Sequence, residues 1–147
     1  AAVEQEISGL KVKFVDRISG STPYEVAVNF AKYKSPVGDF GWNRTEKEGH
    51  AFTFTSVLSP FDSVSGALFA HLGKHTPILV VSRDSLPDVT RNYIESVKPE
   101  PKPEPHPPFM HGWVAGCENV LSSRAQLEIE RALSIDEFHM GMQHKDF

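Results

Sequence analysis

The residues of this chain that could do chemistry are arginines and small polar side chains in short turns that follow apolar runs. Five of them stand out by type and position: Arg17, Ser19, Ser21, Arg83 and Asn119. An arginine in such a turn can pair with a phosphate or a carboxylate through two parallel hydrogen bonds. Backbone N–H groups at the start of a helix also favour anions. We therefore expect these five residues to line a ligand-binding groove for an anion.

Two of these features also have other interpretations. Arg17 could form a purely structural salt bridge with Asp16 or Asp62. The turn over residues 19–22 is loosely similar to a flavin-phosphate loop, which would indicate a small-molecule or nucleotide enzyme. Serine, glycine and threonine are also ordinary turn and capping residues, and neither a dinucleotide glycine fingerprint nor a phosphate-loop lysine motif is present in the sequence. We therefore expect no cofactor.

Catalytic and metal-binding constellations are missing from the sequence. No acid, base and nucleophile form a recognisable set, which favours a binding protein over an enzyme. His106 and His111 lack the spacing of a zinc site and have no cysteine nearby, so we expect no metal. The single cysteine, Cys117, follows an apolar run at a helix start. We interpret it as a small residue in a turn rather than as a catalytic thiol.

Length and charge narrow the class of protein. The 147 residues indicate one domain, residues 1–147. Residues 1–99 hold 11 Lys/Arg and 11 Asp/Glu, whereas residues 100–147 hold 4 against 8 and account for the whole net charge of −4. No basic stripe is present, so nucleic acid is not expected as a partner. No apolar stretch approaches the roughly 20 residues that span a bilayer.

One pattern recurs four times along the chain: a short apolar run, a turn, and a segment with helical periodicity. The expected strands cover about 11–16, 51–58, 78–81 and 113–115. Strands that alternate with helices predict a parallel sheet with crossover helices, here a three-layer α/β sandwich of about four strands. The carboxyl ends of such strands meet at one edge, where ligands bind. We expect that edge to be built from turns 16–22, 59–63, 82–85 and 116–121.

Capping residues indicate where the helices begin. The expected caps are Thr22 with Pro23 and Glu25, then Asp62, then Ser85 or Asp84, and last Ser123 with Gln126. Gly73 is expected to end the second helix. Residues 98–111 form a proline-rich insert that should be extended, because proline fixes φ and removes a donor. Residues 136–147 are expected to form a tail.

Four short motifs occur in register along residues 12–134. They are Arg17-Ile18-Ser19-Gly20-Ser21-Thr22-Pro23-Tyr24-Glu25-Val26-Ala27, Asp62-Ser63-Val64-Ser65-Gly66-Ala67-Leu68, Thr76-Pro77-Ile78-Leu79-Val80-Val81, and Trp113-Val114-Ala115-Gly116. In this order and spacing the chain resembles the second class of the cell-wall-binding repeat family of bacterial surface proteins. It departs from that pattern at Pro23, where the family has a second arginine, and at Cys117, where it has a second glycine.

The resemblance implies both a fold and a function. Modules of that family are Rossmann-like α/β units that hold surface proteins to the cell wall by binding anionic wall polymers. It therefore implies a non-catalytic, extracellular cell-surface module whose partner is an anionic cell-wall glycopolymer. The balanced charge of residues 1–99 argues mildly against a polyanion binder. The alternative is a structural assembly subunit, which would contact neighbouring surface-protein chains through the proline-rich segment and the tail.

Overall fold

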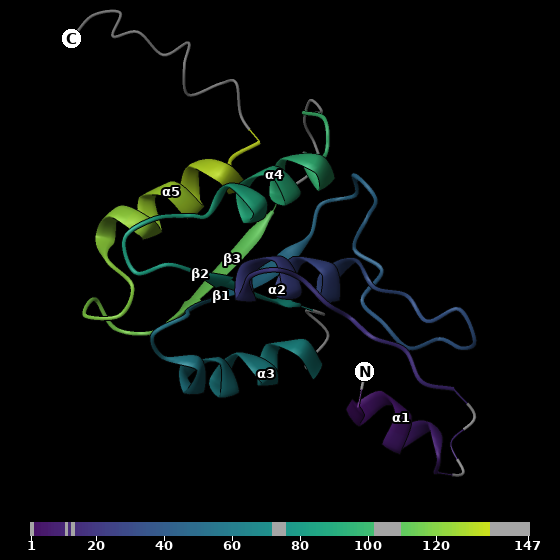
Figure 1. Cartoon of the computed structure of the whole chain (residues 1–147). Coiled ribbons are helices and arrows are strands. Elements are labelled where there is room, and N and C mark those ends of the chain that lie inside the picture. The colour runs from purple at the N-terminus through teal and green to yellow at the C-terminus, as the bar shows by residue number, and fades with distance from the viewer. Residues whose placement is uncertain (1, 11, 13, 72–75, 102–109, 136–147) are drawn as a thin grey trace, which may run out of the picture.

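Three parallel strands with helices on both faces form the centre of the protein (Figure 1). The computed structural model describes residues 2–10, 12, 14–71, 76–101 and 110–135. The strands are β1 (Ala51–Ser56), β2 (Ile78–Val81) and β3 (His111–Ala115), in the order β2-β1-β3. In the register of the sheet, Thr53 of β1 lies between Ile78 and Trp113. The α/β class and the parallel sheet are thus as the sequence predicts.

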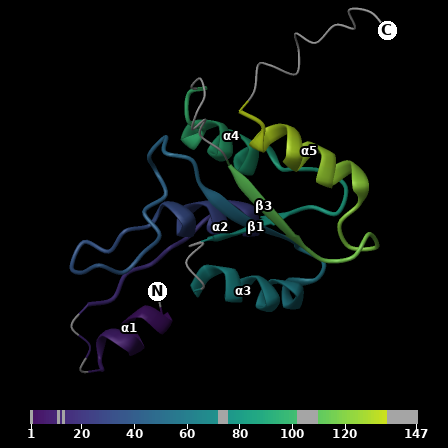
Figure 2. The same ribbon diagram turned by 180° about the vertical axis from the view of Figure 1, so that it is seen from behind.

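The helices divide between the two faces of the sheet, as Figure 2 shows from behind. Their bounds are α1 (Ala2–Ser8), α2 (Pro23–Lys32), the 3₁₀ helix η1 (Pro60–Asp62), α3 (Ser63–His71), α4 (Asp88–Val97) and α5 (Ser123–Leu133). Helix α3 packs against all three strands on one face. Helices α2, α4 and α5 contact one another in that order and cover the other face. Three layers result, with the central strand β1 enclosed on both sides.

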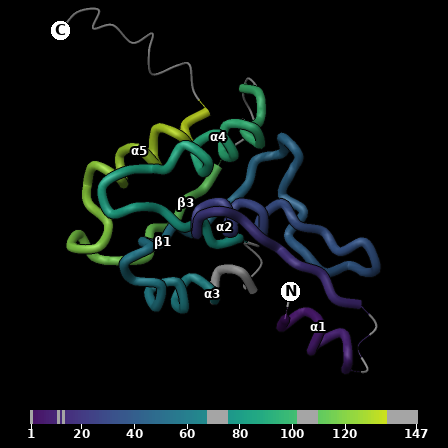
Figure 3. The backbone as a smooth tube through the Cα atoms, viewed as in Figure 1, coloured from purple at the N-terminus to yellow at the C-terminus, as the bar shows by residue number. Residues whose placement is uncertain are grey.

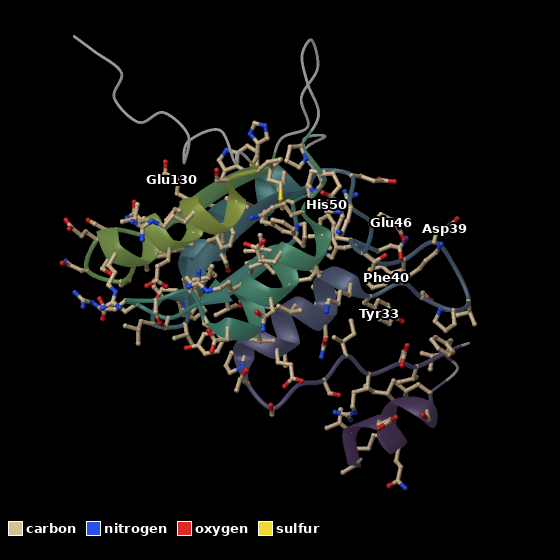
Figure 4. The ribbon with its side chains drawn as sticks, turned by 90° about the horizontal axis from the view of Figure 1, so that it is seen from above. Tyr33, Asp39, Phe40, Glu46, His50 and Glu130 are labelled. Atoms are coloured by element: carbon tan, nitrogen blue, oxygen red, sulfur yellow. The ribbon has the colours of Figure 1, made fainter. Side chains whose placement is uncertain are left out.

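The larger part of the core lies between the sheet and the layer of α2, α4 and α5. Its largest side chains are fully buried: Phe52, Phe54, Leu79, Tyr93, Ile94 and Leu121. The ring of Phe52 meets those of Phe54 and Tyr93 edge to face, with centroids 6.3 and 5.7 Å apart. At the amino end of β1, the buried His50 bonds through Nε2 to the carbonyl of Glu46 at 2.6 Å (Figure 4). Burial lowers the pKa of His50.

The first expected strand, residues 11–16, does not form. Residues 12 and 14–18 lie outside the sheet and run along α2 toward α1 (Figure 3). They are held there by the hydroxyl of Tyr33, which donates to the Asp16 carboxylate at 2.9 Å, while Val12 and Phe14 stay 46% and 44% exposed. Because this segment packs on a helix, it has no neighbouring strand to pair with. The described sheet therefore has three strands rather than the expected four.

One helix start matches its expected cap closely, and a second lies directly after its expected cap residue. Thr22 caps α2, with Pro23 at its first position, and the N–H of Glu25 donates to Thr22 Oγ1 at 3.1 Å. The carboxylate of Glu25 completes the cap by accepting the backbone N–H of Ser21, at 2.7 Å, instead of that of Thr22. Asp62 ends the 3₁₀ turn that leads directly into α3.

The other two starts differ from the expected ones. Helix α5 is capped by Ser122, one residue before the expected Ser123, and Ser122 Oγ accepts from the N–H of Ala125. Helix α4 begins only at Asp88, after Pro87. Pro87 occupies the cap position, two residues after Ser85. The hydroxyls of Ser82 and Ser85 bond to each other instead, at 2.7 Å, and close their own turn. Gly73, the tail over 136–147 and most of the insert over 98–111 lie outside the described residues.

Candidate functional site

The carboxyl edge of the sheet gathers the three connections that leave its strands. Residues 57–62, 82–87 and 116–122 lie at this edge, on the side where α2, α3 and α5 begin (Figure 1). Helix α3 leaves β1 toward one face and α5 leaves β3 toward the other. Such a change of direction between neighbouring strands opens a crevice in parallel α/β folds, and ligands bind there. The candidate site is therefore the edge of the sheet at which the carboxyl ends of β1, β2 and β3 lie.

Arg83 joins two of these connections. Its carbonyl accepts the N–H of Ser122 at 2.9 Å, and its Nε donates to the carbonyl of Asn119 at 2.9 Å. Its Nη1 meets both oxygens of Asp84, at 2.9 and 3.1 Å, and the side chain is 47% exposed. The guanidinium is thus held in one place at the edge. An anion that binds it must compete with a single exposed carboxylate, which is a weak competitor in water.

A carboxylate lies between the connections that follow β1 and β3. Gly116 follows β3 with a φ of +140°, and a Cβ at this position would lie 3.3 Å from Asp62 Oδ2. The Asp62 carboxylate therefore abuts the β3 turn, and glycine leaves it the room to do so. Because like charges repel, an anionic ligand is favoured beside Arg83 and disfavoured against Asp62.

Glu128, a residue of α5, holds the connection that follows β2 in place. Its Oε2 accepts the N–H of Leu86 at 3.0 Å and pairs with Arg91 Nη2 at 2.9 Å. The bond from Leu86 is the main cause that lowers the pKa of Glu128, to which the charge of Arg91 adds. Arg124 approaches the other oxygen at 3.4 Å. Glu128 thus positions the loop that bears Arg83.

The remaining predicted residues make contacts with α1 and α2. Arg17 pairs with Glu4 at 3.3 Å, in place of the expected Asp16 or Asp62. The carbonyl of Ser19 accepts from Asn29 Nδ2 at 2.8 Å. The hydroxyl of Ser21 donates to Glu25, which lowers the pKa of that carboxyl. A hydrogen bond therefore links Arg83 with Asn119, whereas the partners of Arg17, Ser19 and Ser21 lie in α1 and α2.

An apolar cluster at the same edge was not predicted as a functional surface. It consists of the exposed side chains Val57, Leu58, Phe61 and Val64, which we call the β1-turn cluster. Phe61 is 84% exposed. In the sequence, Val57 and Leu58 end the expected strand 51–58, whereas β1 already ends at Ser56 and leaves both side chains exposed. Exposed apolar side chains that adjoin one another mark contact surfaces for proteins more often than isolated ones do.

A groove lies on the other side of β3, against α5. It has a volume of about 500 Å³, and its apolar lining includes Met110, Val114, Ile129 and Leu133. Glu130 of α5, which is labelled in Figure 4, also lines it. This groove was not predicted from the sequence, because it depends on the distance between α5 and the last strand.

Clusters of metal ligands and long apolar helices are absent from the described part of the chain. Within it, no three His, Cys, Asp or Glu residues come together as metal ligands do. Cys117 is exposed, and the ring of His111 stacks on Trp113 with centroids 5.7 Å apart. Among the described helices, none combines the length and the apolar character that crossing a membrane requires.

Comparison with solved structures shows a similar fold in a known protein. No protein-family model matches the chain, and no curated protein matches it. Among solved structures, Cwp6 from Clostridium difficile is similar, with a TM-score of 0.52 and 20% sequence identity. The match covers 79% of this chain and 15% of that chain. At this identity the likeness establishes the fold, and this chain spans only a small part of the length of Cwp6.

Proposed function

We propose that this chain is a non-catalytic module of the cell surface that binds an anionic cell-wall glycopolymer at the carboxyl edge of its sheet. The observation that carries the proposal is the guanidinium of Arg83, held against the Asn119 carbonyl at 2.9 Å. The fold shared with part of Cwp6, a cell wall protein, supports a surface role. The resemblance of four motifs to the cell-wall-binding repeats supports the same role and an extracellular location.

The chemistry of the edge suits a polymer better than a small anion. Arg83 is half exposed and already has one carboxylate partner, so a single phosphate or carboxylate gains little there. A polymer with repeated anionic groups can bind several modules at once, and its retention then far exceeds the affinity of one site. We therefore expect weak binding by one chain and stronger retention where several chains share a polymer.

Arg17, Ser19 and Ser21 belong to the proposal as a second contact. They lie before α2, whose first turn offers backbone N–H groups and a favourable dipole. The Glu25 carboxylate already accepts from Ser21, which lowers the attraction of this position for an anion. We therefore expect this contact to bind the polymer more weakly than the contact at Arg83 and Asn119.

Retention on purified wall glycopolymer tests the proposal. The full chain should sediment with the polymer at low salt and be released at high salt, because exposed charges are screened. Arg83→Ala should reduce retention by about tenfold, the loss of one charge-assisted, partly bidentate contact.

Arg131→Ala is the matched control, because Arg131 is an exposed arginine in the last turn of α5, at the end of the helix away from the carboxyl edge. It should leave retention unchanged. Retention that does not depend on salt in the wild type contradicts polymer binding, and equal losses in both variants contradict the assignment of the site to Arg83.

A second candidate function is a structural assembly subunit, and the β1-turn cluster favours it. Its side chains are apolar and exposed at the edge where polar ligands were expected. Such a surface would contact a neighbouring protein chain rather than a polymer. Phe61→Ser separates the two functions: it should weaken contacts between chains and leave polymer retention intact.

A further inference from the structure

We propose that residues 34–50, which we call the latch loop, open from the rest of the chain when the imidazole of His50 takes up a proton. The loop connects the end of α2 with the start of β1 and therefore lies at the amino end of the sheet. Arg83 and the β1-turn cluster lie at the opposite, carboxyl edge. The inference thus stands independently of the proposed function.

The contacts of the latch loop with the helix layer meet at Arg44. The N–H of Arg44 donates to the carbonyl of Ala31 at 2.9 Å, and the N–H of Asn43 donates to that of Tyr33 at 3.0 Å. The hydroxyl of Tyr93, in α4, donates to the carbonyl of Arg44 at 2.9 Å. These bonds hold the loop to α2 and α4 through its backbone.

The middle of the latch loop buries little apolar surface. Val37 and Phe40 are 64% and 67% exposed, and Phe40 meets the ring of Tyr33 edge to face with centroids 6.3 Å apart (Figure 4). Residues 45–48 are exposed as well. A segment with few buried apolar contacts opens locally at a lower free energy than the core. The latch loop can therefore open while the sheet stays folded.

His50 closes the last turn of the latch loop. Its ring is buried, bonds through Nε2 to the carbonyl of Glu46 at 2.6 Å, and meets the ring of Phe52 edge to face with centroids 6.1 Å apart. Its own carbonyl accepts the N–H of His111 at 3.0 Å. Because a carbonyl only accepts, Nε2 carries the proton of the neutral ring, and a second proton must enter at Nδ1.

The charges that act on this ring come from the latch loop itself. Burial lowers the pKa of His50, and the positive charge of Arg44 lowers it further. The bond to the Glu46 carbonyl and the carboxylate of Glu48 act in the opposite direction without offsetting burial. A protonated His50 is therefore disfavoured as long as the loop is closed.

The neighbouring elements bring positive charge or none. In α4, burial raises the pKa of Tyr93, so its phenol stays neutral. Lys32 of α2 lies over the Tyr93 ring, with Nζ 5.1 Å from the centroid. In β3, the ring of His111 stacks on Trp113. None of these groups stabilises a positive charge on the closed latch loop.

Acid should therefore favour the open loop. In water a histidine has an ordinary pKa of about 6.5, whereas the pKa of His50 in the closed loop lies below its ordinary value. Below about pH 6.5 the open form binds the proton first. The free energy that keeps the loop closed is then fully present above this pH and is lost as pH falls toward the lowered value.

Amide hydrogen exchange of the full chain, measured by NMR at several pH values, tests the proposal. The readout is the protection factor, the exchange rate of an unstructured chain divided by the measured rate at the same pH. Between pH 7.5 and 5.5 the protection factor of the Arg44 amide should fall by about three- to tenfold. That of Ile129, which is buried in α5, should stay constant.

Two variants identify the group that responds. His50→Gln should abolish the fall at Arg44, because a glutamine can still donate to the Glu46 carbonyl but does not titrate. His111→Gln is the matched control, since His111 is an exposed histidine of β3, and it should keep the fall.

The wild type alone can overturn the proposal, even where a variant fails to fold. A protection factor at Arg44 that is constant from pH 7.5 to 5.5 overturns it. An equal fall at Arg44 and Ile129 overturns it too, because the whole chain rather than the latch loop would then open. A fall that persists in His50→Gln contradicts the assignment to His50.

Discussion

The two halves of the carboxyl edge differ in chemistry although they occupy equivalent positions in the fold. The connections after β2 and β3 are polar and linked to each other, with Arg83 held on Asn119 and Ser122. The connection after β1 is apolar, and its Phe61 is 84% exposed. Topology alone therefore does not determine what an edge can bind.

The difference arises from how each connection satisfies its own backbone. After β2, the hydroxyl of Ser82 accepts the N–H of Ser85 at 3.1 Å, and the long side chain of Arg83 is left to reach the next connection. After β1, Ser56 Oγ accepts from Leu58 at 3.2 Å and the chain turns at once into a 3₁₀ helix. This short turn has no room to bury its apolar side chains. The polar half suits an anion, and the apolar half suits a protein.

Gly116→Ala should have the largest effect, because Gly116 lies where the two halves meet. Its φ of +140° is strained for any L side chain, and a Cβ would crowd Asp62 of the apolar half and Val120 of the polar half. We expect the free energy of unfolding in urea to fall by about 1–3 kcal/mol. Gly38→Ala, at a position with open space around it, is the control. Equal, small changes in both variants would show that the halves do not meet as described.

The Asp84→Asn variant tests whether the polar half of the edge binds the polymer through Arg83. Removing the carboxylate that pairs with Arg83 at 2.9 Å frees the guanidinium for an anionic polymer. We expect retention on wall glycopolymer to rise by about two- to fivefold, the value of an exposed ion pair. A decrease would mean that Asp84 supports the site instead of competing with the ligand.

Glu128→Gln should make the free energy of unfolding less dependent on pH in the acid range. The pKa of Glu128 is lowered in the folded chain, so its contribution to stability is present above its ordinary pKa and is lost as pH falls through the lowered value. Between pH 5 and pH 3, about the range of a carboxyl group, the wild type should lose more unfolding free energy than Glu128→Gln. Glu95→Gln, on an exposed part of α4, is the control, and an equal pH dependence in Glu128→Gln and the wild type would contradict this role.

Phe61→Ser should have the smallest effect on stability. An exposed side chain that contributes little packing changes the free energy of unfolding by no more than about 0.5 kcal/mol. Polymer retention should be unchanged, whereas any association through the β1-turn cluster should weaken. Thermal unfolding and retention measured on the same preparation check both parts. A large loss of stability would show that Phe61 belongs to the core.

The sequence predicted the central elements well because burial constrains them strongly. The run Ile78–Val81 is apolar at every position, and it forms β2 with the expected bounds. Thr22 and Pro23 predicted the start of α2 because few other arrangements satisfy the first N–H groups of a helix. Burial and capping are local constraints, and a sequence carries them directly.

Other features depend on contacts between distant segments, which the sequence does not carry. The alternation of residues 12–16 predicts a strand, but whether a strand forms depends on an available edge, and the segment packs on α2 instead. Arg17 pairs with Glu4 of α1, a helix that was not predicted. Arg83 and Asn119 lie at one edge and are joined by a hydrogen bond. The β1-turn cluster and the groove against α5 depend on packing that the sequence does not show.

Amide chemical-shift mapping of the full chain with purified anionic wall glycopolymer tests the central claim most directly. A protein of 16.4 kDa suits this measurement. The account predicts the largest shifts in residues 82–87 and 116–122, with smaller ones before α2 and none in the β1-turn cluster. Shifts confined to the β1-turn cluster, or no shifts at low salt, would contradict it.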